Sequence, residues 1–133
     1  MIVDDVLAEI GRDLVTCGPD ATCLEAARVL SQHRIGLLLV LEGEANVGVL
    51  SERDIVRMLA EVGEAALSTR VGDMMTKNVV SCELGRSLSD AVEMMNANGI
   101  RHLVVGRAGK VDGVISLHDI TRYVERTSTL YEI

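Results

Sequence analysis

Two short segments of the chain carry the same polar residues at the same spacing. Residues 48–55 read GVLSERDI and residues 113–120 read GVISLHDI, so a glycine, a serine and an aspartate recur three residues apart. A glycine lets a backbone approach a neighbour or a ligand closely, and a serine at a helix start lies beside free amides that favour a phosphate. An aspartate there can accept hydrogen bonds from both hydroxyls of a ribose, at about 1.5–3 kcal/mol each. The pattern is therefore consistent with binding of a ribose phosphate.

The same residues also have a purely structural interpretation. Ser51 and Ser116 can cap a helix that follows them, and Asp54 and Asp119 are favoured in its first turn by the helix dipole alone. Duplication preserves a cap as readily as a binding site. Neither copy by itself decides between the two interpretations.

The two segments belong to a longer internal repeat. Shifted by 65 positions, residues 15–57 align without a gap onto residues 80–122. Such a repeat usually means two copies of one supersecondary unit, each burying its apolar face against the other. In each copy the hydrophobic periodicity predicts a strand, a helix, two strands joined by a polar turn, and a second helix. The repeated serine then lies between the last strand and the second helix.

The order β-α-β-β-α predicts an α/β fold. Helix starts are expected after the capping-box residues Thr22 and Ser87, and a helix end at Asn98-Gly99. The expected strands are 14–17, 37–41, 47–50, 79–82, 102–105 and 111–115, and the second helices are about 53–61 and 118–126. The predicted domains are a lead-in helix (1–11), repeat 1 (12–62), a linker (63–75) and repeat 2 (76–133). Val71, Met74 and Met75 are expected to pack the linker against the second copy.

Composition limits the classes of function. The net charge of −7 argues against a general nucleic-acid-binding role. No apolar run approaches the roughly 20 residues that span a bilayer, and the opening MIVDDVLAEIG has no basic segment typical of a secretory signal. With three cysteines, an odd number, a reducing cytoplasm is the expected location.

Other reactive side chains do not form a recognisable site. Cys17, Cys23 and Cys82 are expected to be buried, inert thiols, and redox sensing is the alternative if Cys17 or Cys23 is exposed. The three histidines lack metal-ligand spacing, so no metal site is predicted, and His33 is expected at the surface. The motifs G-x-x-x-x-G-K-[ST], G-x-S-x-G and H-E-x-x-H are absent from the sequence, and we expect no catalytic activity.

The tandem motif, each copy preceded by a strand–helix–strand unit, resembles a pair of CBS domains, also called a Bateman module. The stretches RIGLLLV, GVLSERDIVR, VGDMMTKNVVSC and GIRHLVV are similar to small stand-alone bacterial proteins of this family, and the resemblance covers residues 7–125. It implies two repeats that pack through their sheets with pseudo-twofold symmetry and leave two clefts. Such clefts bind adenosine-containing ligands: AMP, ADP, ATP, NAD(H) or S-adenosylmethionine.

The resemblance also implies roles for individual residues. The motif aspartate holds the ribose, the serine contacts phosphate, and the other repeat grips the base. The first cleft would combine Ser51, Arg53, Asp54, Val80, Ser81, Arg101 and His102. The second cleft would combine Ser116, His118, Asp119, Val15, Thr16, Gly36 and Leu37. Arg53 and Arg101 favour the first cleft for the more highly phosphorylated ligand.

The expected function is that of a regulatory adenine-nucleotide sensor that acts on a partner protein in trans. The resemblance implies a homodimer formed through helices, for which the apolar faces of residues 55–59 and 120–124 are candidates. The alternative is a ligand-free interaction or scaffold module in which both motif aspartates serve only as helix caps.

Overall fold

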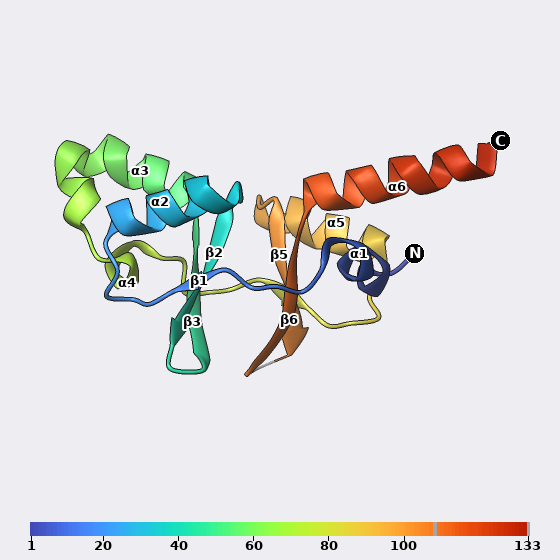
Figure 1. The fold of residues 1–133 in the computed structure, drawn as a ribbon, viewed down its shortest axis with the longest axis horizontal. Helices are drawn as coiled ribbons and strands as arrows, with labels where there is room; N and C mark the ends of the chain where they lie inside the picture. The colour runs from blue at the N-terminus through green and yellow to red at the C-terminus, as the bar shows by residue number, and fades with distance from the viewer. Residues whose placement is uncertain (108, 133) are drawn as a thin grey trace. The chain divides into compact units, whose positions relative to one another are not determined.

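The computed structural model describes residues 1–107 and 109–132, and it confirms the order β-α-β-β-α in both copies (Figure 1). The first copy comprises β1 (Thr16–Cys17), α2 (Cys23–His33), β2 (Leu37–Glu42), β3 (Ala45–Ser51) and α3 (Glu52–Val62). The second comprises β4 (Ser81–Cys82), α5 (Leu88–Asn98), β5 (His102–Arg107), β6 (Lys110–Ser116) and α6 (Leu117–Glu132). The flanking elements are α1 (Val3–Ile10), the 3-10 helix η1 (Gly63–Ser68) and α4 (Val71–Met74). The α/β fold class is therefore confirmed.

Each copy builds its own three-stranded sheet. β1 pairs with β2 in parallel and β2 with β3 in antiparallel orientation, and β4, β5 and β6 repeat this arrangement. A parallel pair needs a crossover, which α2 and α5 provide, whereas an antiparallel pair closes with a short turn. Both hairpins carry a register shift at the equivalent place, Val40/Leu41 and Val105/Gly106. The repeat in the sequence is thus a repeat in topology and in register.

The predicted helix caps are present. The Glu25 amide donates to Thr22 Oγ1 at 3.1 Å, and the Asp90 amide donates to Ser87 Oγ at 3.0 Å. Gly99 ends α5 in the left-handed conformation at φ 63°, as expected. The residue 65 positions earlier is Arg34, which ends α2 in the same conformation at φ 56° without being a glycine. Tertiary context therefore holds a backbone angle that the residue type disfavours.

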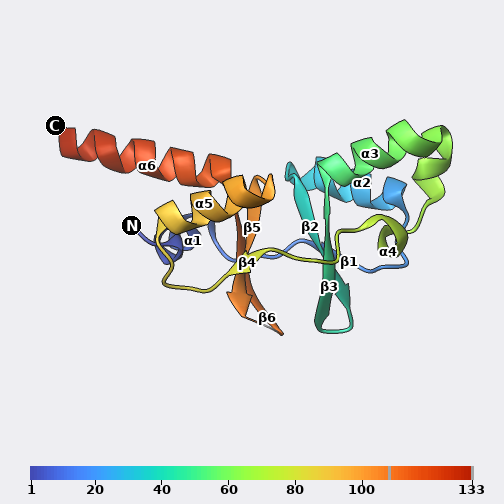
Figure 2. The same ribbon diagram turned by 180° about the vertical axis from the view of Figure 1, so that it is seen from behind.

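The chain divides into two compact units, and each contains one repeat. The first-repeat unit comprises residues 15–79, and the second-repeat unit comprises residues 1–14 and 80–133. Figure 2 shows both from behind. No helix of the described residues is both long and apolar enough to cross a membrane.

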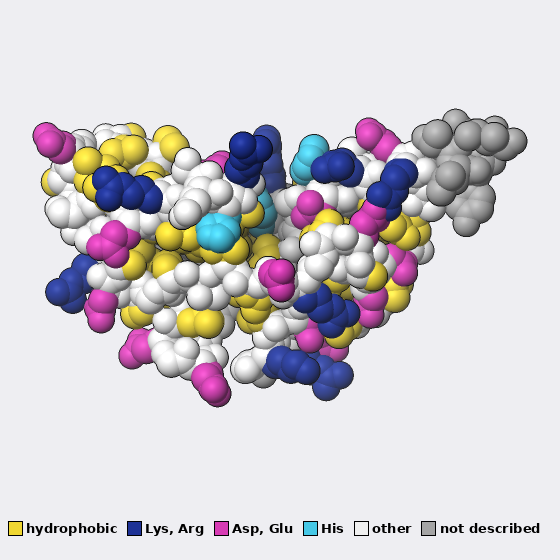
Figure 3. Space-filling view, viewed as in Figure 1, with side chains coloured by type: hydrophobic (Ala, Val, Ile, Leu, Met, Phe, Trp, Pro, Cys, Tyr) yellow, Lys and Arg dark blue, Asp and Glu magenta, His cyan; other side chains and the backbone are white. Residues whose placement is uncertain are grey.

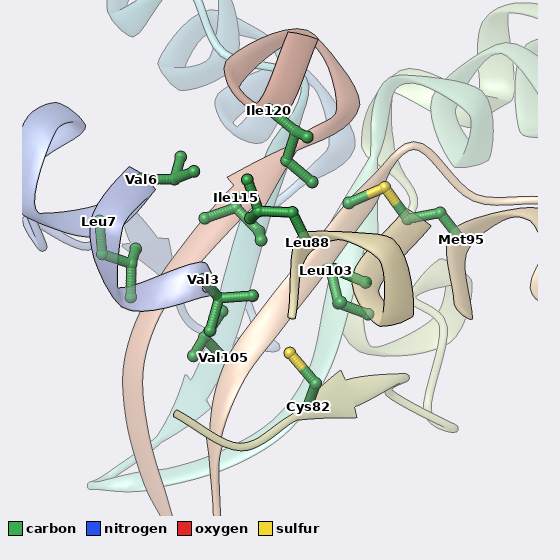
Figure 4. Close-up of a cluster of buried hydrophobic side chains, with 11 residues drawn as sticks. Val3, Val6, Leu7, Cys82, Leu88, Met95, Leu103, Val105, Ile115 and Ile120 are labelled. Carbon is green, nitrogen blue, oxygen red and sulfur yellow. The ribbon is translucent and has the colours of Figure 1, made fainter. Parts of the chain in front are cut away.

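The core of the second-repeat unit includes the lead-in helix (Figure 4). Val3, Val6 and Leu7 of α1 are at most 1% exposed and point toward the hydrophobic side chains of β5 and β6. The buried cluster comprises Val3, Val6, Leu7, Cys82, Leu88, Ala91, Met95, Leu103, Val105, Ile115 and Ile120. Helix α1 precedes the first repeat in the chain, yet its apolar face is buried by the second.

The linker packs against the first repeat, so the expectation that it packs against the second copy is wrong. Val71 is fully buried in the same cluster as residues of α2, β2 and β3, and Met74 and Met75 lie against that cluster. Backbone bonds fix the arrangement: the Val71 amide donates to Ala21 O at 2.8 Å, and the Cys23 amide donates to Thr69 O at 2.8 Å. These partners satisfy the linker's backbone within residues 15–79.

Candidate functional site

Both repeats form a complete capping box at the motif serine and aspartate. In the first repeat the Ser51 amide donates to Asp54 Oδ2 at 2.9 Å and the Asp54 amide donates to Ser51 Oγ at 3.2 Å. In the second, the Ser116 amide donates to Asp119 Oδ2 at 2.9 Å and the Asp119 amide donates to Ser116 Oγ at 3.0 Å. Both motifs therefore start a helix, with a carboxylate at its positively polarised end.

The two motif carboxylates differ in their surroundings. Asp54 is only 6% exposed, whereas Asp119 is half-buried. Ser51 Oγ donates to Asp54 Oδ2 at 3.1 Å, and Thr76 Oγ1 donates to Oδ1 and Oδ2 at 3.3 and 3.4 Å. Arg57 Nη1 lies 3.5 Å from Oδ1. Asp54 is therefore buried at the start of α3, because these side chains surround it.

The motif glycines make room for a protein neighbour. A Cβ atom at Gly48 would lie 2.7 Å from Met75 Sδ and 2.8 Å from Thr76 O. At Gly113 it would lie 2.6 Å from Leu7 Cδ2. The first glycine therefore admits the linker and the second admits α1. Close approach explains the repeated glycine within each unit.

In the first-repeat unit, several of the predicted site residues meet at one end of the sheet. Leu37 pairs with Ser51 across the β2–β3 ladder, and the Glu52 amide donates to Gly36 O at 3.0 Å. Thr16 pairs with Leu39, whose amide donates to Val15 O at 3.3 Å. The motif serine and helix start thus lie beside the segment that begins β2.

The second-repeat unit reproduces this arrangement. His102 pairs with Ser116, and the Leu117 amide donates to Arg101 O at 2.8 Å. Ser81 pairs with Val104, whose amide donates to Val80 O at 3.4 Å. His118 is exposed in the first turn of α6, and Arg53 is exposed in the first turn of α3. Each unit thus places the motif serine of one predicted cleft beside residues predicted to contact the base in the other cleft.

A groove that sequence reasoning missed lies between α1 and α6 of the second-repeat unit. It has a volume of about 590 Å³. Its lining residues are Val6, Glu9, Ile10, Asp119, Arg122, Tyr123, Glu125 and Arg126. Arg126 forms an ion pair with Glu9 that ties the two helices together. The sequence carries no signal for this groove, because it depends on α1 packing against the second repeat.

The cysteines are free thiols. Cys23 and Cys82 are buried, as expected, whereas Cys17 is half-buried. Burial raises the pKa of all three thiols, and at Cys82 the nearby Arg86 lowers the pKa and Asp4 raises it by smaller amounts. A thiol with a raised pKa is a poor nucleophile at neutral pH. In the described part of the chain, no group of three or more His, Cys, Asp or Glu side chains could hold a metal ion.

Charged side chains of both signs are interspersed on the face of the molecule shown in Figure 3. His33, the last residue of α2, is exposed as expected.

Two βαββα units, each with a Ser-x-x-Asp capping box at the start of its second helix, define a tandem-repeat α/β module. The family model of the CBS domain matches residues 3–61 and 71–126. The chain therefore belongs to the CBS-domain family. The matched ranges include α1 and α4, the two short helices that pack against the repeats.

Similar proteins come from bacteria, archaea and plants. The crystal structure of the CBS-domain containing protein ATU1752 from Agrobacterium tumefaciens is 37% identical, covers 92% of this chain and 98% of its own, and has a TM-score of 0.89. The protein PAE2072 from Pyrobaculum aerophilum, solved in complex with AMP, is 28% identical, with a TM-score of 0.77 and coverage of 90% and 89%. The mitochondrial CBS domain-containing protein CBSX3 of Arabidopsis thaliana is 30% identical over 92% of this chain. The chain spans 57–64% of the length of three curated relatives that it matches, CBSX3 among them.

Proposed function

We propose that the protein is a regulatory module that binds adenosine nucleotides. The observation that carries this proposal is the repeated Ser-x-x-Asp motif, which presents a carboxylate at a helix start beside the end of the sheet in both repeats. A carboxylate so placed can accept the two hydroxyls of a ribose, and the helix start favours a phosphate. The AMP complex of the relative PAE2072 supports an adenosyl ligand.

We assign the ligand contacts as the family resemblance implies. Ser51, Arg53 and Asp54 would bind one ligand together with Val80, Ser81, Arg101 and His102 of the other repeat. The second ligand would bind Ser116, His118 and Asp119, together with Val15, Thr16, Gly36 and Leu37. Within each unit, the motif of one proposed cleft lies at the same end of the sheet as the residues proposed to contact the base in the other cleft.

The proposed activity is sensing without catalysis. A bound ligand would favour one conformation of the module, and a separate partner protein would detect the changed surface. Three free thiols support a reducing cytoplasm as the location of this activity. Hydrogen exchange with and without AMP would locate the surface that responds, and unchanged exchange in the presence of bound ligand would contradict a sensing role.

Calorimetry tests the proposal most directly. Nucleotide-stripped protein would be titrated with AMP, ATP, NAD, NADH and S-adenosylmethionine. We expect saturable binding of at least one of the five, because both carboxylates lie at helix starts. Absence of binding by all five would contradict the proposal.

A ligand-free scaffold is the second candidate. It is favoured by the completeness of both capping boxes, in which serine and aspartate satisfy each other without a ligand. Under this alternative, replacing either aspartate would change helix stability and no ligand affinity.

We also propose that the protein forms a homodimer through α3. Val56, Leu59 and Val62 are 64%, 41% and 49% exposed, and a spacing of three residues places them on one face of the helix. Burial of this face in a dimer would remove apolar surface from water. Val56→Asp should shift sedimentation toward the monomer, whereas Leu84→Asp, at a residue 38% exposed outside α3, should not. A wild-type protein that sediments as a monomer would contradict the proposal.

A further inference from the structure

Both oxygens of the Asp54 carboxylate are already engaged by protein donors. Oδ2 accepts from the Ser51 amide at 2.9 Å and from Ser51 Oγ at 3.1 Å. Thr76 Oγ1 lies 3.3 Å from Oδ1 and 3.4 Å from Oδ2, so its hydroxyl is shared between them. A ribose that used this carboxylate would meet the Thr76 hydroxyl at the same acceptor atoms.

The backbone holds Thr76 in this position. The Thr76 amide donates to Val49 O at 2.9 Å, and the Val49 amide donates to Thr76 O at 3.0 Å. This isolated antiparallel bridge extends the pairing of β3 by one residue. The close approach at Gly48 allows it, because a Cβ there would lie 2.8 Å from Thr76 O. The backbone bridge therefore keeps the Thr76 hydroxyl next to the Asp54 carboxylate.

The second repeat lacks this hydroxyl. The residue 65 positions before Thr76 is Gly11, which has no side chain to donate. Within the described residues, the Asp119 carboxylate accepts one hydrogen bond, from the Ser116 amide. Asp119 instead lines the groove between α1 and α6. Arg57 adds to the difference, because its Nη1 lies 3.5 Å from Asp54 Oδ1, whereas within the described residues we find no ion pair between its counterpart Arg122 and Asp119.

We infer that Thr76 is a built-in competitor for the ligand hydroxyls at Asp54, so that the two motifs bind a ribose nucleotide with unequal affinity. This inference rests on the proposed nucleotide binding and adds an order to it: the Asp119 motif fills first. Binding at Asp54 requires the Thr76 hydroxyl to turn away or to change its acceptor. Thr76 thereby sets the concentration range over which the second ligand binds.

The test isolates the Asp54 motif by working in the Asp119→Ala background. AMP would be titrated by calorimetry into Asp119→Ala, Asp119→Ala/Thr76→Val and Asp119→Ala/Thr76→Ser. Valine keeps the β-branched shape and the backbone bridge but removes the hydroxyl, whereas serine keeps the hydroxyl. Because the two bonds from Thr76 are long, we expect the valine variant to bind AMP about 5-fold more tightly and the serine variant to match its parent. Circular dichroism would confirm that each variant is folded.

The possible outcomes distinguish a failure of this inference from a failure of the proposed nucleotide binding. Wild-type protein that binds none of AMP, ATP, NAD, NADH and S-adenosylmethionine would contradict both the proposed function and this inference. If wild-type protein binds another of the five ligands and not AMP, that ligand replaces AMP in the titrations. Binding by wild type, with the valine variant equal to or weaker than its parent, would overturn the inference alone and would mean that Thr76 orients the carboxylate for the ligand. Loss of the tighter isotherm in Asp54→Ala would show that AMP fills the Asp54 motif of wild-type protein first. That result would also overturn the inference.

Discussion

Replacing Asp119 with alanine should weaken AMP binding at the Asp119 motif by about 100-fold and leave the weaker binding at the Asp54 motif. The expected ligand contacts of this carboxylate are two hydrogen bonds from ribose hydroxyls, each worth about 1.5–3 kcal/mol to a charged acceptor, so their joint loss amounts to about 3 kcal/mol or more. The helix start should survive, because Ser116 Oγ still accepts from the amide of residue 119. Calorimetric titration of wild type and variant measures the change.

Two further variants control for folding. Asp119→Asn keeps an acceptor for the Ser116 amide and removes the charge, so its affinity should lie between those of wild type and Asp119→Ala. Asp90→Ala removes an aspartate from the same capping position of α5, where the Ser87 hydroxyl caps the helix, and should leave AMP binding unchanged. Equal loss of affinity in Asp90→Ala and Asp119→Ala would show that the effect reflects stability, and the scaffold interpretation would then be preferred.

The second large effect concerns the lead-in helix. Leu7→Ala should lower the free energy of unfolding by about 2–5 kcal/mol, the range for a buried leucine truncated to alanine. Leu7 is 0% exposed, and its Cδ2 fills the space beside Gly113 in β6. Urea denaturation followed by circular dichroism measures the loss.

A matched position on the same helix provides the control. Ile10 is 45% exposed, and Ile10→Ala should cost less than about 1 kcal/mol. Amide hydrogen exchange should locate the loss caused by Leu7→Ala in β5 and β6 rather than in β2 and β3, because α1 packs within the second-repeat unit. Faster exchange confined to β2 and β3 would contradict the packing of α1 against the second repeat.

Much of the local structure follows from the sequence. The ungapped shift of 65 residues determined two copies of one βαββα unit, because apolar positions with strand and helix periods recur in the same order. Local chemistry also determined the helix starts at Thr22 and Ser87 and the helix end at Gly99. The helix starts and the helix end each depend on residues within a few positions of one another, and the repeat depends on an ungapped match, so all of them can be inferred from the sequence.

The environment of the motif aspartates was decided by tertiary structure. The same Ser-x-x-Asp pattern gives a carboxylate that is 6% exposed in the first repeat and half-buried in the second. Thr76 and Arg57 both contact Asp54, and Thr76, 22 positions after it in the chain, reaches it only because the linker pairs with Val49. Neither the burial of Asp54 nor the shared hydroxyl follows from its immediate neighbours in sequence.

The attachment of the flanking segments was decided in the same way. By itself the sequence determined that residues 2–10 and 71–75 carry apolar faces that need a partner, and the tertiary structure decided which repeat covers each. Helix α1 packs against the repeat that follows it at a distance, and the linker packs against the repeat that precedes it. Burial is non-directional, and both repeats offer an apolar surface beside a glycine. The partners are distinguished by shapes that meet at Gly48 and Gly113, a methionine with its backbone in one case and a leucine in the other, and by backbone bonds such as Val71 N–H to Ala21 O and Val3 N–H to Arg86 O.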